Sequence, residues 1–125
     1  MLNDKRNLMT VKLDSKGLNA SIGSNILPEK KMRELGFTDH SGSNWYFVQR
    51  VANDITFNLT IPKNGGRLSI DVLDEDFGQP YDYQAILKRS PKLEYALNVK
   101  GGVELLMGRF VSQGVLTGWK KGMYI

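Results

Sequence analysis

The 125-residue sequence predicts an α+β domain, because its strand-like and helix-like segments are grouped rather than alternating. Three runs rich in β-branched and aromatic residues follow one another at 44–51, 55–61 and 67–74. Segments with helical spacing of apolar residues come after them. We therefore expect a single domain over 1–125, in which helices cover one face of an antiparallel sheet.

The first part of the chain, 1–24, is expected to form a hairpin or an arm. Two short pieces of alternating apolar residues, at about 8–13 and 18–22, flank the turn-forming sequence Asp-Ser-Lys-Gly. The sequence leaves open whether this hairpin joins the central sheet.

A short amphipathic helix is predicted next, over 28–35. Pro28 suits the first helical turn, and Gly36 suits the left-handed position that commonly follows the last turn. Met32 and Leu35 would lie on the side that faces the core.

The three central runs predict an antiparallel meander. In the run 55–61 apolar residues alternate with polar ones, as they do in 67–74, so that one face would be buried and the other would face water. Short polar turns separate the runs, and the second turn contains Asn64-Gly65, which is a strong hairpin signal.

The last part of the chain predicts helices that cover the sheet. Pro80 and the acids near it suit a helix start, Pro91 ends that helix, and Gly101-Gly102 interrupts the next one. The predicted helices are 80–89, 91–99 and 102–113. The tail that follows is expected to form a short strand or a strap on the core.

Charge is unevenly distributed along the sequence. The net charge is +4, but the segment 71–82 carries five acids and no base, and the segment 83–125 carries seven bases and two acids. The sequence has no cysteine, which excludes disulfides and thiolate metal sites. No apolar segment is long enough for an export signal or a membrane span, so we expect a cytoplasmic protein without membrane contact.

The acidic segment is the first candidate site. Its acids are expected just before the N-terminus of a helix, where a negative charge stabilises the helix by about 0.3–1 kcal/mol. Exposed acids and tyrosines at this junction would also suit contact with another protein, as would a tyrosine on the outer face of the sheet. The candidates for protein binding are Asp74, Glu75, Asp76, Tyr81, Asp82, Tyr83 and Tyr46.

The same acids are weaker candidates for a metal site. The calcium-loop pattern fails, because Gly78 and Ala85 stand where two ligands are needed. A magnesium site on Asp71, Asp74 and Asp76 is chemically conceivable, but no lysine lies nearby in the sequence to assist at a phosphate. No phosphate-binding or dinucleotide-binding motif is present, and no cofactor is expected.

Clusters of basic residues form the third candidate site. They would supply salt-dependent affinity for nucleic acid, although no recognised DNA- or RNA-binding motif accompanies them. The candidates are Lys30, Lys31, Arg33, Arg50, Arg67, Lys88, Arg89, Lys92, Lys120 and Lys121.

These observations favour a small non-enzymatic protein that acts by contact with another protein. An accessory protein of a phage or mobile element, or an inhibitor of a host enzyme, would have this character, and a homodimer is compatible with it. Two alternatives remain open: a nucleic-acid-binding protein that uses the basic clusters, and a metal-dependent hydrolase or nuclease that uses the aspartate cluster.

Overall fold

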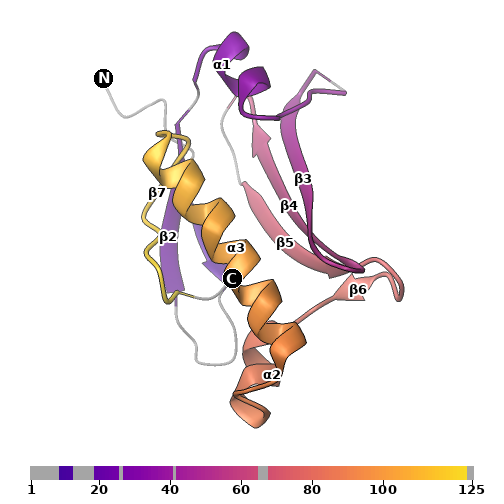
Figure 1. The fold of residues 1–125 in the computed structure, drawn as a ribbon. Helices are drawn as coiled ribbons and strands as arrows, with labels where there is room; N and C mark the ends of the chain where they lie inside the picture. The colour runs from indigo at the N-terminus through magenta and orange to yellow at the C-terminus, as the bar shows by residue number, and fades with distance from the viewer. Residues whose placement is uncertain (1–8, 13–18, 26, 41, 65–67, 124–125) are drawn as a thin grey trace.

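The fold is α+β, as the sequence predicts. The computed structural model describes residues 9–12, 19–25, 27–40, 42–64 and 68–123 (Figure 1). In chain order the elements are β1 (Met9–Lys12), β2 (Asn19–Ser24), α1 (Glu29–Glu34), β3 (Asn44–Ala52), β4 (Ile55–Pro62), β5 (Ser69–Asp74), β6 (Gln79–Pro80), α2 (Tyr83–Arg89), α3 (Glu94–Ser112) and β7 (Leu116–Thr117). In the described ranges, no helix combines the length and apolarity that a membrane span requires.

The strands form two separate antiparallel sheets. One sheet has the order β3-β4-β5-β6 and contains the predicted meander, and the other has the order β1-β2-β7. The N-terminal hairpin therefore does not extend the central sheet. Instead Gly23 and Ser24 of β2 pair with Thr117 and Leu116 of β7, so the hairpin and the C-terminal tail share a sheet of their own.

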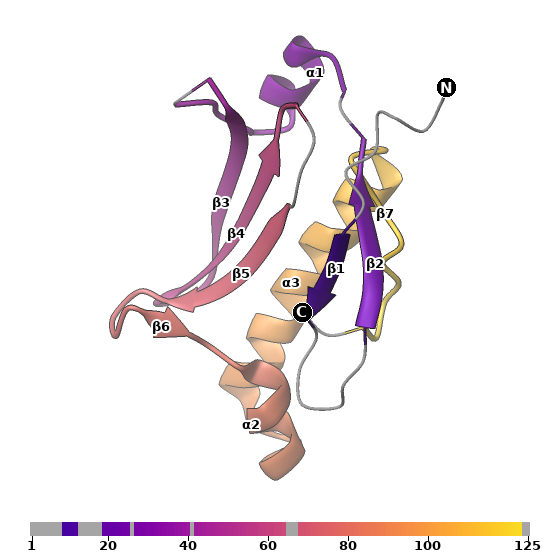
Figure 2. The same ribbon diagram turned by 180° about the vertical axis from the view of Figure 1, so that it is seen from behind.

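Helix α3 lies between the two sheets, as both views of the ribbon show (Figures 1 and 2). The central sheet turns its apolar side chains toward the helix. Along β4 the residues Phe57, Leu59 and Ile61 are buried, whereas Asn58 and Thr60 are half-buried on the outer face. The alternation predicted from the sequence is thus confirmed.

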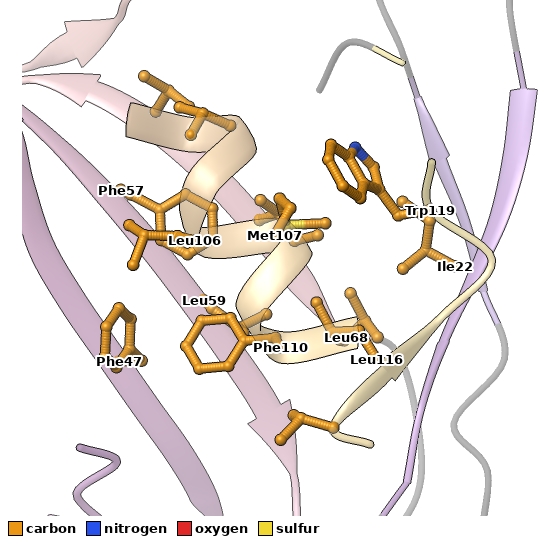
Figure 3. Close-up of a cluster of buried hydrophobic side chains, with 14 of the residues drawn as sticks. Ile22, Phe47, Phe57, Leu59, Leu68, Leu106, Met107, Phe110, Leu116 and Trp119 are labelled. Carbon is orange, nitrogen blue, oxygen red and sulfur yellow. The ribbon is translucent and has the colours of Figure 1, made fainter. Parts of the chain in front are cut away.

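The core is built around α3 (Figure 3). The Phe110 ring lies 4.9 Å from the Phe47 ring and 5.3 Å from the Phe37 ring, measured between centroids. On the other side of the helix, Ile22 and Trp119 are buried against the same core. The buried residues of α3 are Ala96, Val99, Val103, Leu106, Met107 and Phe110.

The helices near the C-terminus differ from the prediction in two ways. Pro80 belongs to strand β6, where it pairs with Leu73, and α2 begins only after Asp82, whose carboxylate accepts the Ala85 amide at 3.0 Å. The second difference is that α3 continues through the glycine pair as one helix.

Close packing explains why the glycine pair does not end α3. A Cβ added at Gly102 would lie 2.8 Å from Cβ of Val51 in β3, so only glycine lets the helix approach the sheet this closely. Burial of Val99 and Val103 on either side of the pair outweighs the low helix propensity of glycine, which amounts to about 1 kcal/mol per residue.

Candidate functional site

The acids at the end of β5 form a hairpin turn rather than the start of a helix. Asp74 Oδ1 accepts the amides of Asp76 and Phe77 at 3.0 and 3.3 Å, and Gly78 takes a positive φ of 63° before β6 begins. Phe77 is 74% exposed at this turn. The expectation that these acids lie next to a helix N-terminus is therefore wrong for Asp74, Glu75 and Asp76.

The other residues of the acidic segment have separate structural roles. Glu75 accepts the Thr56 hydroxyl at 2.5 Å, and Asp82 caps α2. Tyr81 packs half-buried with its ring 6.0 Å from that of Tyr95, and burial raises the pKa of the Tyr81 hydroxyl. Tyr83 is 1% exposed, so it lies in the core rather than on the surface expected for it.

The remaining aspartate and tyrosine candidates lie on the outer face of the central sheet. Asp71 stands opposite Asn58, and the Tyr46 hydroxyl accepts the side-chain amide of Asn44 at 3.1 Å. Across the described part of the chain, no three carboxylates or imidazoles are grouped as metal ligands would be.

The basic candidates are spread over the molecule. Helix α1, which carries Lys30, Lys31 and Arg33, lies at the end of α3 opposite to α2 in both views (Figures 1 and 2). The group near α2 is formed by Lys88, Arg89 and Lys92, and Lys120 and Lys121 follow β7. Arg50 lies on β3 and donates to the Asn53 carbonyl, and Arg67 falls outside the described residues.

One charged cluster joins α1 to the central sheet. Asp39 binds Arg33 at 2.9 Å and Lys63 at 2.5 Å, and both cations lie over the buried Trp45 ring, at 5.2 and 4.3 Å from its centroid. We call Arg33, Asp39, Lys63 and Trp45 the clamp. Sequence reasoning missed it because its members come from distant parts of the chain and follow no spacing rule.

Charge balance within the clamp is visible in its pKa values. The hydrogen bond from Lys63 is the largest influence and lowers the pKa of Asp39; burial opposes this shift and Arg33 adds to it. The pKa of Arg33 is raised by its hydrogen bonds to Glu29 and Asp39. The clamp is thus a set of opposite charges that satisfy one another.

An open groove of about 630 Å³ runs over the outer side of α3, between β3 and the segment after β7. Leu105 stands in it with 74% of its surface exposed. Pockets of this volume accommodate small molecules or a few side chains of a partner. The groove is lined by Gln49, Gly101, Glu104, Leu105, Leu106, Gly108, Arg109, Ser112 and Lys121.

Two glycines in the groove are not required by packing. A Cβ added at Gly101 would have no atom within 4 Å, and one at Gly108 would meet only the Trp119 ring at 3.9 Å, an ordinary contact. Glycine inside a helix is less stable than alanine by roughly 0.5–1 kcal/mol. Gly101 and Gly108 therefore weaken α3 without a reason inside the fold, in contrast to Gly102.

The groove is lined by two cations, Arg109 and Lys121, and by one carboxylate, Glu104. The Arg109 guanidinium lies 5.6 Å from the Phe47 ring centroid and 5.2 Å from that of Phe110, which holds it beside the groove. Glu104 is engaged by the Gly122 amide at 3.2 Å. Among the ion pairs of the described residues, none involves Arg109 or Lys121.

Strand β3 forms an edge of the central sheet next to this groove. The amide and carbonyl of Tyr46 bond to Thr38, on the side away from β4. Because backbone groups alternate in direction along an antiparallel strand, those of Val48 and Arg50 point to the same edge. For these two residues the described part of the chain supplies no backbone partner at that edge.

Comparison with known proteins gives a likeness of fold. No family model matches this chain, and no curated protein matches it. A solved structure of a DUF1831 family protein from Lactobacillus plantarum superposes with a TM-score of 0.62, covering 93% of this chain and 98% of that chain. The two sequences are 10% identical, so the likeness concerns the fold alone.

Proposed function

We propose that this chain is a binding protein that holds a segment of another protein in the groove over α3. The observation that carries the proposal is the exposure of Leu105 beside two glycines that the fold does not need. Covering a bulky apolar side chain in a hollow surface favours binding. Each Å² of apolar area removed from water contributes about 25 cal/mol to the binding free energy.

The arrangement of charges supports a protein partner over the two alternatives. The basic candidates are separated over α1, α2 and the segment after β7, so they offer no single track for a nucleic-acid backbone. The candidate metal ligands Asp74 and Asp76 are committed to a hairpin turn. The groove, in contrast, combines an apolar floor with charged residues at its rim, as protein-binding sites do.

The test is a selection of short random peptides displayed on phage against the intact chain. Selected peptides are synthesised and titrated against the wild type, Leu105→Glu and Leu97→Glu. Leu97 is the matched control, because it is 42% exposed on the same helix and lies outside the groove. We expect Leu105→Glu to weaken binding by about tenfold or more and Leu97→Glu by less than about threefold.

The proposal fails if no selected peptide depends on Leu105, or if both substitutions weaken binding equally. Circular dichroism of both variants checks that each retains the fold, which is expected because the two leucines are exposed.

A further inference from the structure

We infer that the partner segment binds as an additional β-strand on the edge of β3, with alternate side chains packed in the groove and a carboxylate facing Arg109 and Lys121. The inference rests on the proposed function and specifies the mode of binding and the chemistry of the partner. It follows from three observations that meet at one place: an open sheet edge, an uncovered helix face and two cations that form no ion pair among the described residues.

The sheet edge supplies the backbone contacts. Val48 and Arg50 direct their amide and carbonyl groups away from β4, and Val48 is 61% exposed. An extended chain placed at the usual strand spacing of about 4.8 Å would bond to these groups and continue the sheet. β3 is the outer strand on this side of the sheet, and α3 lies across its inner face (Figure 1).

The groove supplies the side-chain contacts. Gln49 separates the two edge residues and turns its side chain inward, where it lines the groove together with Leu105. A strand added beside β3 would point every second side chain in the same inward direction. Those side chains would reach the face of α3 between Gly101 and Gly108, where the missing Cβ atoms leave room for them.

The charges indicate an acidic partner. Arg109 and Lys121 line the groove with one carboxylate, Glu104, which accepts the Gly122 amide and forms an ion pair with neither cation in the described structure, so the lining has an excess of positive charge. A carboxylate on the added strand would pair with these cations, most favourably where apolar side chains exclude water. The partner segment is therefore extended, apolar at alternate positions and acidic.

A second copy of this chain fits the same edge less well. Pairing two β3 strands about a twofold axis would bring Arg50, Arg109 and Lys121 of both copies to one seam, and like charges at a seam oppose association. A helix in the groove would cover Leu105 but leave the backbone of Val48 and Arg50 unpaired. The extended acidic segment is the occupant that satisfies all three features.

N-methylation of the selected peptides tests the strand mode directly. Two versions of each peptide are made, one methylated on the odd amides of the core and the other on the even amides. If the peptide pairs with β3, one register loses about tenfold or more in affinity and the other changes by less than about threefold. Equal effects in the two registers would overturn the inference.

Substitutions in the chain provide an independent test. Val48→Pro removes the edge amide without removing a bond to β4, and Val48→Thr is the matched control that keeps the amide. We expect about a tenfold loss of peptide affinity in the first and little change in the second. If Val48→Pro fails to fold, the methylated peptides and the double substitution Arg109→Gln with Lys121→Gln test the inference instead. The double substitution should weaken the binding of acidic peptides and lower its dependence on salt.

The outcomes separate this inference from the proposed function. Dependence on Leu105 without a register effect would retain the groove as a protein-binding site and reject the added strand. Independence from Leu105 would reject both. A dimer detected by sedimentation that dissociates in Val48→Pro would identify a second copy as the occupant and contradict the acidic partner.

Discussion

Two places on the surface set cations over aromatic rings, and they differ in how the charge is completed. In the clamp, Arg33 and Lys63 lie over Trp45 and both bind Asp39. In the groove, Arg109 lies over Phe47, and no described carboxylate pairs with it. The cations over the ring are therefore paired with a carboxylate of the chain in the clamp, whereas the cation over the ring in the groove has no such pair among the described residues.

The difference separates a structural role for the clamp from the binding role proposed for the groove. Trp45 in the clamp is 3% exposed, whereas Leu105 in the groove is 74% exposed. A closed cluster contributes to stability, because its charges and its ring already have their partners. An open one contributes little to stability and leaves apolar area and charge for another molecule. Substitutions in the clamp should thus lower stability, whereas substitutions in the groove should lower peptide affinity.

The largest expected effect is loss of the clamp ring. Trp45→Ala removes a buried aromatic side chain and should lower the free energy of unfolding by about 3–5 kcal/mol. Leu105→Ala should change it by less than about 0.5 kcal/mol, because the side chain is exposed. Urea denaturation of the two variants measures both, and similar losses would erase the distinction drawn between clamp and groove.

Two neighbouring glycines of α3 give the next contrast. Gly102→Ala should destabilise the chain by about 1–3 kcal/mol, because its Cβ would collide with Val51. Gly101→Ala should stabilise it by about 0.5–1 kcal/mol, because its Cβ meets no atom and alanine is the better helix former. Gly101→Ala should nevertheless weaken peptides bound in the groove. Thermal melts and peptide titrations of the two variants check these expectations. Equal melting temperatures for Gly101→Ala and Gly102→Ala would contradict them.

The clamp should also show a pH dependence. The pKa of Asp39 is lowered in the folded state, so its contribution is complete above the ordinary value of 3.8 and is lost as pH falls through the lowered pKa. Asp39→Asn should thus unfold at lower urea concentration than the wild type at neutral pH. The gap should close only in strong acid, and Asp71→Asn, on the outer sheet face, serves as control.

The smallest expected effect on stability is that of the groove cation. Arg109→Gln should change the free energy of unfolding by about 0.5 kcal/mol, the lower end of what an exposed cation–π contact contributes, since Arg109 is exposed and makes no ion pair in the described structure. Its effect should instead appear in binding, as a smaller dependence of peptide affinity on salt. A large stability loss would place Arg109 with the clamp.

The parts of the fold that depend on local pattern could be predicted from the sequence. Alternation at Phe57, Leu59 and Ile61 predicts the meander and its buried face correctly. The joining of β2 to β7 could not be predicted, because two short strands so far apart carry no mutual signal. The break expected at Gly101-Gly102 fails because tertiary packing overrides local propensity.

The candidate site was less predictable. The acidic segment draws attention in the sequence, yet Asp74 and Asp82 are used by a turn and a helix cap. The signal for the groove was present: Gly101, Leu105 and Gly108 repeat at helical spacing on the side opposite Val103. The open edge of β3 had no such signal, because the order of strands in a sheet depends on contacts between distant segments and cannot be predicted from the sequence of one strand.

The small sheet makes the timing of folding during synthesis depend on the far end of the chain. Asn25 donates its side-chain amide to the carbonyl of Gly114, 89 residues later, and Ile22 is buried with Trp119. A ribosome must therefore complete nearly the whole described chain before β2 has its neighbour β7. Until then Ile22 lacks the C-terminal neighbours, Leu116 and Trp119, with which it shares the core.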